Sequence, residues 1–416
     1  MKICVLGGGV VGTTAAWMLS EAGHDIVLVE QSKRMAAATS HANASLLTPG
    51  HSMAWNSPRA PIDFLKSWLD RDPVMKMRLK SLWKSFPWIW HFLRRCPPQA
   101  VERLNGLLLR LSLESTEKTE ALTQSLGLDV SLDSKGLLYW HGSEAGLEQD
   151  RKHADWVSRQ GLDARIISAD EVLRLQPALA DRRNPVVGGY YVREDRVADA
   201  RALTHQLGIQ LLLHGQEILC EHELQGFVKE GGRICAVRTN RGEIEADAFV
   251  LALGPWTGQA LRQLKVGFPI NPAKGYSMTL SLHEEVAPLQ ISGMDADEYV
   301  TFAMLGDRLR VTSYAHFDGF DLSTPEGRFA RHRRAVDDNF PGLVDWTAET
   351  KKWCGLRPMS PDGLPTIDRV PGHDNLWLNA GHGYLGWTLA VLSAEMLRDR
   401  MDGVTGATPD GLGWRW

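Results

Sequence analysis

The sequence opens with an apolar run, a glycine-rich turn and a helical pattern, and this order constrains the fold more than any other feature. The turn, residues 7–12, reads Gly-Gly-Gly-Val-Val-Gly and matches GxGxxG. Residues 3–6 are apolar, as in a strand buried on both faces, and residues 13–22 suit a helix. A second apolar run, 26–29, leads into Glu30. This order predicts a dinucleotide-binding βαβ unit.

Each glycine of the turn has a separate physical task in such a unit. Gly7 permits the tight turn, Gly9 lets the backbone approach the pyrophosphate, and Gly12 allows the helix to pack closely on the strand. The helix that follows the turn presents backbone N–H groups and the positive end of its dipole to the phosphates, and Val10 and Val11 of the turn are expected to contact the cofactor there. The alternative is a glycine-rich turn in another kind of α/β protein.

Glu30 lies eighteen residues after Gly12, where an acidic side chain accepts hydrogen bonds from the adenosine ribose. An acid here disfavours a 2′-phosphate, so we expect FAD or NAD rather than NADP. An NAD enzyme would continue with regular βα units. Here a small polar stretch (40–45) and a long helical insertion (about 64–126) follow, and the buried-strand pattern returns only around 248–254. This arrangement favours FAD.

Length and composition set further limits. A chain of 416 residues exceeds the usual size of one domain, so two or three structural units are expected. The net charge of −4 gives no sign of nucleic-acid binding. The five cysteines are scattered, which argues against a metal site or a disulfide framework. The sequence shows neither a signal peptide nor an apolar run of ~20 residues, so we expect a cytoplasmic protein. Peripheral contact with the inner face of the cell membrane stays open.

Several separated stretches carry a resemblance to a known family. They are residues 5–12, 40–50, 274–277, 355–363 and 375–388. In these stretches the sequence resembles the D-amino-acid oxidase superfamily of FAD-dependent oxidoreductases. Within that superfamily it is most similar to the bacterial D-amino acid dehydrogenases of the small-subunit type. The resemblance extends over almost the whole chain.

The resemblance implies an α/β fold of two domains. One is a Rossmann-like FAD-binding domain of the glutathione-reductase type, and the other is an α+β substrate domain on a mixed or antiparallel sheet. We expect residues 1–50, 152–262 and 353–416 to form the FAD-binding domain. Residues 51–151 and 263–352 are then expected to form the substrate domain.

The resemblance also implies an activity. It is the FAD-dependent oxidative deamination of a D-amino acid by hydride transfer from Cα to flavin N5. The imino acid product hydrolyses to a 2-oxo acid and ammonia, and the electrons pass to a quinone-type acceptor. One alternative is an oxidase or dehydrogenase of a cyclic or secondary amino acid, such as D-proline, D-hydroxyproline, glycine or sarcosine. An alternative of another class is a flavoprotein subunit without catalysis.

The flavin is expected to be held without a covalent bond. In the related sarcosine oxidases a cysteine near the matched arginine bonds the flavin. Here Gly355 stands at that position, and Cys354 lies one residue away.

Three residues are candidates for the substrate site. The resemblance places Arg357 at the α-carboxylate, where a guanidinium makes a bidentate pair that fixes orientation as well as position. Tyr276 would add a phenolic hydrogen bond to the same carboxylate, and His382 would act electrostatically near the flavin pyrimidine. The alternatives are a structural arginine, a core tyrosine and a structural histidine.

Further residues are expected to contact FAD, beyond those of the first βαβ unit. They come from the polar stretch, the late strand and the C-terminal glycine-rich segment. They are Ser40, Asn43, Ala44, Ser45, Leu46, Gly254, Trp256, Gly381, Gly383, Tyr384, Leu385, Gly386 and Trp387.

The sequence departs from the dehydrogenase pattern in two places. After residues 308–311, the family's Gly-Gly-(apolar)-Ala-Glu becomes Thr-Ser-Tyr-Ala-His, so the glycines are lost and His316 replaces the acid. The family pattern is only half kept in residues 194–199. If these strands border the substrate cavity, D-alanine need not be the best substrate, and a larger or cyclic D-amino acid is an option.

Residues 64–96 combine tryptophans with lysines and arginines. A basic amphipathic segment with tryptophans suits an anionic membrane surface, where a quinone would be available. The competing interpretation is a helical part of the substrate domain whose tryptophans belong to the core.

Overall fold

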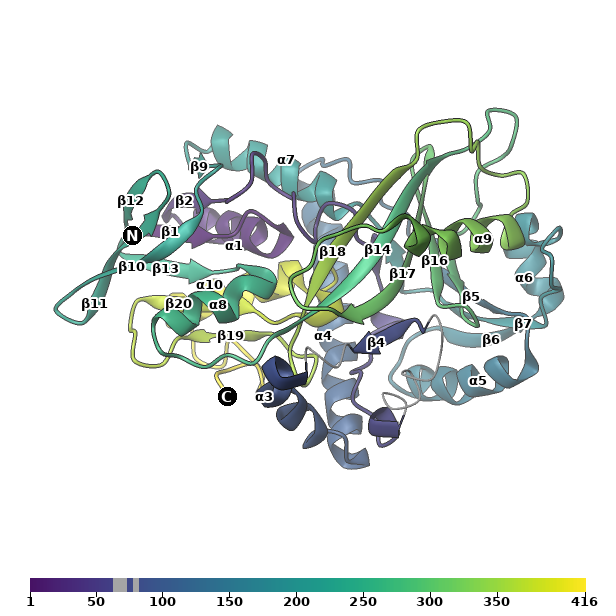
Figure 1. Ribbon diagram of the computed structural model, residues 1–416, viewed down its shortest axis with the longest axis horizontal. Helices are drawn as coiled ribbons and strands as arrows, with labels where there is room; N and C mark the ends of the chain where they lie inside the picture. Colours follow the sequence, from purple (N-terminus) through teal and green to yellow (C-terminus); the bar gives the residue numbers. More distant parts are fainter. Residues whose placement is uncertain (63–72, 78–81) are drawn as a thin grey trace.

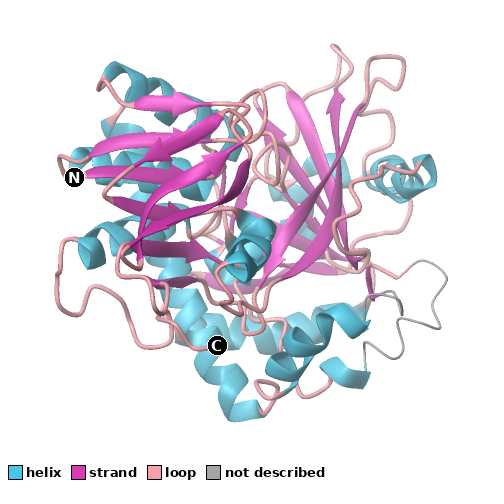
Figure 2. Cartoon of the chain, turned by 60° about the vertical axis from the view of Figure 1, so that its left-hand side comes forward, coloured by secondary structure: helices cyan, strands magenta, loops and turns pink. Residues whose placement is uncertain are grey.

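The computed structural model describes residues 1–62, 73–77 and 82–416 of the chain. Figure 1 shows two β-sheets side by side, a smaller one at the left near the N-terminus and a larger one at the right. Figure 2 shows both sheets in one view, with helices along their lower edge. This is the predicted combination of a Rossmann-like sheet with a second, mixed sheet.

The first sheet is parallel except at one edge, where β19 lies antiparallel to β20. Its middle strands are those predicted from the apolar runs. In order across the sheet, the described strands are β19 (Thr366–Arg369), β20 (Leu376–Ala380), β13 (Ala248–Leu251), β1 (Lys2–Leu6), β2 (Asp25–Val29) and β9 (Glu217–Leu219).

Strand β1 is buried on both faces because its side chains alternate between two cores. Ile3 and Val5 pack with the helices of one face, and Cys4 and Leu6 pack against the small sheet and helix of the other. The helices of the first face are α1 (Val10–Glu21), α7 (Ala200–Leu213) and α10 (Ala390–Met401). The second face carries α8 (Thr257–Gln263), β10 (Leu224–Glu230), β11 (Arg233–Thr239) and β12 (Gly242–Glu245).

The second sheet contains nine described strands. Eight of them follow one another in the order β18 (Lys351–Met359), β14 (Asn271–Ser281), β17 (Arg308–Phe317), β16 (Val300–Leu305), β15 (Gly293–Asp295), β5 (Leu137–His141), β7 (Gly188–Val192) and β6 (Ala164–Ser168). The ninth, β4 (Met75–Met77), pairs with β17. A separate pair joins β3 (Leu46–Leu47) to β8 (Arg196–Val197). Helices α5 (Glu144–Arg159), α6 (Ala169–Leu175) and α9 (Ala330–Asn339) complete this part.

One row of residues crosses the middle of the second sheet. Thr312 of β17 pairs with Thr301 of β16, Thr301 with Met294 of β15, and Met294 with Tyr139 of β5. Partners in register point to the same face of a sheet, about 4.8 Å apart from strand to strand. The row therefore forms one continuous surface over four strands.

The two sheets do not follow the residue ranges expected for the two domains. Strands β6 and β7 lie within 152–262, and β18 lies almost wholly within 353–416, yet all three pair in the second sheet. Apolar strands look alike in a sequence whichever sheet they join, so these pairings could not be read from pattern alone.

The expected insertion of 64–126 contains α3 (Leu82–Leu93), α4 (Pro98–Ser125) and the short strand β4. Part of the tryptophan-rich segment, residues 63–72 and 78–81, lies outside the described residues. Within the described part, no helix combines the length and apolar character needed to cross a membrane.

Candidate functional site

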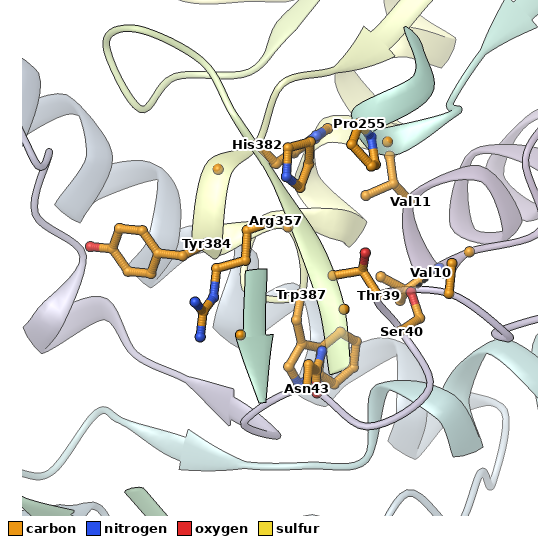
Figure 3. Close-up of a pocket in the computed structure, with 18 of the residues that line it drawn as sticks. Val10, Val11, Thr39, Ser40, Asn43, Pro255, Arg357, His382, Tyr384 and Trp387 are labelled. Atoms are coloured by element: carbon orange, nitrogen blue, oxygen red, sulfur yellow. Dashed lines mark hydrogen bonds between the residues drawn. The ribbon is translucent and has the colours of Figure 1, made fainter. Parts of the chain in front are cut away.

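A cavity of about 830 Å³ opens at the carboxyl ends of the first sheet's strands and extends over the second sheet. Its lining includes Gly7 after β1, Glu30 after β2, Gly254 after β13 and Gly381 after β20. Carboxyl ends of parallel strands are where α/β folds bind nucleotides. Figure 3 shows this region, with Val10 and Ser40 at one side and Arg357 and Tyr384 at the other.

The glycine-rich turn has the geometry that GxGxxG predicts. Gly7 has φ +118°, and a Cβ there would lie 2.4 Å from the Ala252 carbonyl oxygen. A Cβ on Gly12 would lie 1.9 Å from the Gly7 carbonyl oxygen, so Gly12 serves helix–strand packing and does not itself line the cavity. Gly9 caps α1 and lines the cavity. The Val10 N–H donates to Ser40 Oγ at 2.9 Å, which holds the polar stretch against the helix.

The Glu30 carboxylate is buried and fixed by two backbone donors. Gly8 N–H donates to Oε2 and Ser32 N–H donates to Oε1, both at 2.8 Å. Each oxygen can accept more than one hydrogen bond, so the carboxylate can still receive the ribose hydroxyls. The sequence did not single out Gly8, although a Cβ there would lie 2.9 Å from the Cβ of Glu30.

The polar stretch forms a rigid loop along the cavity, and Ser40, Asn43, Ala44, Ser45 and Leu46 all line it. Ser45 has φ +60°, and its N–H donates to Asn43 Oδ1 at 3.0 Å. The buried Arg310 donates to the Asn43 carbonyl at 3.0 Å, and burial lowers its pKa to about 10. Thr39 Oγ1 donates to the Leu356 carbonyl at 2.7 Å. The loop is thereby joined to both β17 and β18.

Arg357 lies on β18 with its guanidinium in the cavity. Its Nη1 donates to the Tyr314 carbonyl at 2.6 Å, and burial alone lowers its pKa to about 10. No carboxylate among the described residues pairs with it. Arg357 is half-buried, and a desolvated cation without a counter-charge is unfavourable unless a ligand supplies one, so the site is suited to a bound anion.

Two neighbours set the position of this guanidinium. A Cβ on Gly275 would lie 2.8 Å from Arg357 Nη2, so only glycine leaves room for it. Tyr314 has φ +72° at an irregularity in the β14–β17 pairing, and this conformation turns its carbonyl to Arg357. Sequence analysis included Tyr314 in the stretch that departs from the dehydrogenase pattern but assigned it no role beside Arg357, because its surroundings resemble an ordinary strand.

Tyr276 lines the cavity one residue from Gly275 and is buried. Its ring meets Tyr314 and Phe329 edge to face, at centroid distances of 5.7 and 5.9 Å. Burial raises the pKa of its phenol to about 12, so the hydroxyl remains a hydrogen-bond donor at ordinary pH. Its hydrogen bond to a substrate carboxylate stays a prediction.

His382 lines the cavity and is almost fully buried. Its Nε2 lies 3.1 Å from Ser393 Oγ, and burial lowers its pKa to about 3. The imidazole is therefore neutral at ordinary pH. The electrostatic role expected for it can come only from a neutral dipole, and not from a positive charge.

The C-terminal glycine-rich segment lines the cavity with Gly381, Gly383, Tyr384, Gly386 and Trp387. Tyr384 donates its hydroxyl to the Met53 carbonyl at 2.6 Å, and Trp387 Nε1 donates to the Ala198 carbonyl at 3.0 Å. Leu385 differs from the other expected positions of this segment. It does not line the cavity but packs in the core beside α1, because the short helical turn at 383–385 points it inward.

Of the remaining positions discussed from the sequence, some line the cavity and others do not. Gly254, with φ +54°, and Trp256 line it. Cys354 does not, and its Sγ donates to the Leu322 carbonyl at 3.2 Å, whereas Gly355 does line the cavity. That no cysteine bonds the flavin stays a prediction.

The two stretches that depart from the dehydrogenase pattern differ in how they lie relative to the cavity. Thr312, Ser313 and Tyr314 line the cavity, as expected if β17 borders it. His316 is buried outside it, with Nε2 3.2 Å from the Pro73 carbonyl. Asp195 is also outside, and accepts from Tyr139 Oη at 2.8 Å.

Comparison with known proteins gives a match over nearly the whole chain. The family model described as DAO, FAD dependent oxidoreductase, matches residues 2–400. The chain belongs to this family of FAD-dependent oxidoreductases. It is therefore an enzyme with FAD as its cofactor, and the predicted fold class is confirmed.

Curated relatives agree with the resemblance predicted from the motifs. The chain is 34% identical to D-amino acid dehydrogenase 2 of Mesorhizobium japonicum, over 97% of both proteins. It is also 34% identical to D-amino acid dehydrogenase of Agrobacterium fabrum, over 97% of this chain and 96% of the relative.

Solved structures confirm the fold. Glycine oxidase from Geobacillus kaustophilus superposes with a TM-score of 0.78 at 20% identity, over 99% of this chain and 98% of the other. L-proline dehydrogenase from P. horikoshii superposes with a TM-score of 0.72 at 17% identity, over 99% and 95%.

The cavity fits the cofactor of this family. Gly7, Gly9 and Gly12 allow the close approach that a pyrophosphate needs, α1 points its N-terminus into the cavity, and Glu30 is positioned for the ribose. Gly381 and Gly383 expose backbone at the other end, next to His382.

Proposed function

We propose that the protein oxidatively deaminates a D-amino acid with FAD as electron acceptor. The observation that carries the proposal is the half-buried, desolvated guanidinium of Arg357, which lacks a carboxylate partner among the described residues and faces the cavity of an FAD-dependent enzyme. The names of the curated relatives support the same activity.

The chemistry that bound FAD would supply is acceptance at N5 of a hydride from the substrate Cα. Arg357 would hold the α-carboxylate in a bidentate pair, which fixes rotation about the bond to Cα and so aims the Cα–H. The Tyr276 hydroxyl would donate to the same carboxylate. The amino acid loses two electrons and two protons to give an imino acid, and water then releases ammonia and a 2-oxo acid.

The test is anaerobic mixing of the purified yellow protein with D- and L-amino acids while the flavin absorbance is followed. The proposal expects bleaching by D-amino acids and little by their L-enantiomers. Reoxidation of the bleached protein by a quinone dye, and slowly by air, would support the quinone-type acceptor, while fast reoxidation by air would support an oxidase. Bleaching only by glycine, sarcosine or D-proline would favour the cyclic or secondary amine alternative. A flavin that no amino acid bleaches would contradict the proposal.

A second proposal concerns the electron acceptor's location. Helix α3 buries Trp88 and Phe92, which supports the core interpretation for those rings, but leaves Phe86, Trp90 and Leu93 exposed at 59%, 53% and 42%. Spacings of four and three residues put the exposed three on one helix face, with Arg94 adjoining Trp90. We propose that this face, the α3 patch, rests on an anionic membrane surface where a quinone is available.

A further inference from the structure

Strands β14 to β18 contribute one surface of the cavity. The side chain of a substrate whose α-carboxylate is held at Arg357 would contact this surface. We call this surface the sheet wall. It consists of Gly275, Tyr276, Met294, Thr301, Thr312, Ser313, Tyr314, Ala315, Trp353, Gly355, Arg357 and Pro358. All residues of these five strands are described, and Arg357 is the one charged residue on the sheet wall.

A substrate held at Arg357 would lie beside the middle of this wall. The guanidinium reaches over Gly275 to the Tyr314 carbonyl on β17. Thr312 is two residues away on the same strand, roughly 7 Å along it, and Thr301 is one strand, about 4.8 Å, further across. These distances match the length of an amino acid side chain.

The threonine and serine hydroxyls of the wall are already bonded within the protein. The Thr301 and Thr312 hydroxyls bond each other, and Ser313 donates to the Tyr299 carbonyl at 3.0 Å. Apart from Arg357 and the phenol hydroxyls of Tyr276 and Tyr314, the other side chains of the wall are apolar or aromatic, namely those of Met294, Ala315, Trp353 and Pro358.

We propose that the substrate is an amino acid with an uncharged, predominantly apolar side chain, which lies on the sheet wall. The inference rests on the proposed function and specifies its substrate class. A cationic side chain would find no carboxylate on the wall, and an anionic one would compete with the α-carboxylate for Arg357. Burying such a charge without a partner costs enough to reduce binding by roughly a hundredfold or more.

The first experiment measures binding without turnover. Hexanoate, its ω-amino derivative and adipate share one carboxylate and differ only in a neutral, cationic or anionic tail. Each is titrated into the oxidised holoenzyme, and the perturbation of the flavin spectrum gives Kd. The inference predicts that hexanoate binds at least about thirtyfold more tightly than the other two. Equal affinities would overturn it.

The second experiment adds a charge to the wall. Thr301→Asp introduces a carboxylate on the wall, and Thr301→Asn is its neutral match in shape. The ratio of kcat/KM for D-lysine to that for D-norleucine is measured in both variants and in the wild type. The ratio should be about a hundredth or less in the wild type and in Thr301→Asn, and should rise at least tenfold in Thr301→Asp.

The outcomes separate the two proposals. If the wild type oxidises D-lysine and D-glutamate as well as D-norleucine and D-glutamine, the proposed function stands and the inference is overturned. If Thr301→Asp folds but shifts the lysine ratio no more than Thr301→Asn does, the sheet wall is not the side-chain site. If no D-amino acid reduces the flavin, the proposed function fails. In that case the tail preference in the binding series still decides whether the wall excludes charge.

Discussion

The guanidinium of Arg357 lies so close to Gly275 that a Cβ on Gly275 would stand 2.8 Å from Nη2 and 2.9 Å from Nη1. The two residues are on neighbouring strands, and the glycine supplies the space into which the arginine extends. The absence of a side chain at Gly275 thus makes room for the guanidinium of Arg357.

This relationship predicts that Gly275→Ala displaces Arg357. A shift of about 1 Å in a substrate-positioning group can lower kcat/KM by about a hundredfold. FAD content should change little, because Gly275 lies on the second sheet, whereas the glycine-rich turn and Glu30 follow strands of the first. Gly226→Ala in β10 is a matched control, since a Cβ there meets nothing closer than 3.7 Å. Steady-state kinetics with the best D-amino acid that match in the two variants would contradict the packing argument.

Tyr314 gives a second prediction, because its φ of +72° is one that glycine adopts freely and β-branched residues strongly resist. Tyr314→Gly and Tyr314→Val both remove the ring, but only glycine keeps the carbonyl turned to Arg357 at no cost. The valine variant should bind hexanoate about tenfold more weakly than the glycine variant. Flavin difference spectra give both Kd values, and equal values would show that the bulge does not position Arg357.

Asp195 predicts a pH dependence of stability. Burial raises its pKa from 3.8 to about 7, while Tyr139 and the Gly50 N–H donate to it. A raised carboxyl pKa means that the folded state holds the proton more strongly than the unfolded state. Stability is then fully present below pH 4 and is lost as pH rises through 7, by at most roughly 4 kcal/mol.

The check is the thermal midpoint of unfolding of the wild type and of Asp195→Asn between pH 4 and 8. The asparagine cannot ionise, so the variant should gain several degrees relative to the wild type as pH rises. A constant difference across this range would mean that Asp195 is ionised in the folded protein throughout.

The geometry of the glycine-rich turn and the position of Glu30 could be predicted from the sequence, because these features are local. The turn of Gly7, Gly9 and Gly12 and the acid Glu30 lie within one βαβ unit, where chain order fixes spatial order. Features that depend on tertiary packing could not be predicted in the same way. Nothing local shows that Leu385 turns into the core while its neighbours line the cavity, or that burial keeps His382 neutral.

The same limit applies to the second sheet. The row from Thr312 to Tyr139 joins strands that are far apart in sequence, and a shift of one residue in any register would turn its side chains to the other face. Family motifs identified Arg357, but the space at Gly275 and the left-handed backbone of Tyr314 that position it depend on how β14, β17 and β18 pair.

The α3 patch predicts salt-sensitive binding to anionic vesicles. Replacing Phe86, Trp90 and Leu93 with serine should reduce co-sedimentation severalfold at low salt, because each exposed apolar side chain adds to interfacial binding. High salt should weaken wild-type binding by screening the basic residues. The control replaces Ile209, Leu212 and Leu213 of α7, which are exposed to a similar or greater degree. If the wild type ignores anionic vesicles, or both triple variants bind equally, the patch is not a membrane surface.

The most direct test of the account is the anaerobic rate of flavin reduction by a D-amino acid in the wild type, Arg357→Lys and Arg357→Ala. The account predicts that all three bind FAD. Loss of a buried charge pair costs about 2–5 kcal/mol, so kcat/KM for reduction should fall by roughly thirtyfold to several thousandfold in Arg357→Ala. Lysine should restore only part, because an ammonium cannot make the bidentate pair. An Arg357→Ala enzyme that is reduced as efficiently as the wild type would contradict the carboxylate-binding role on which the proposed function rests.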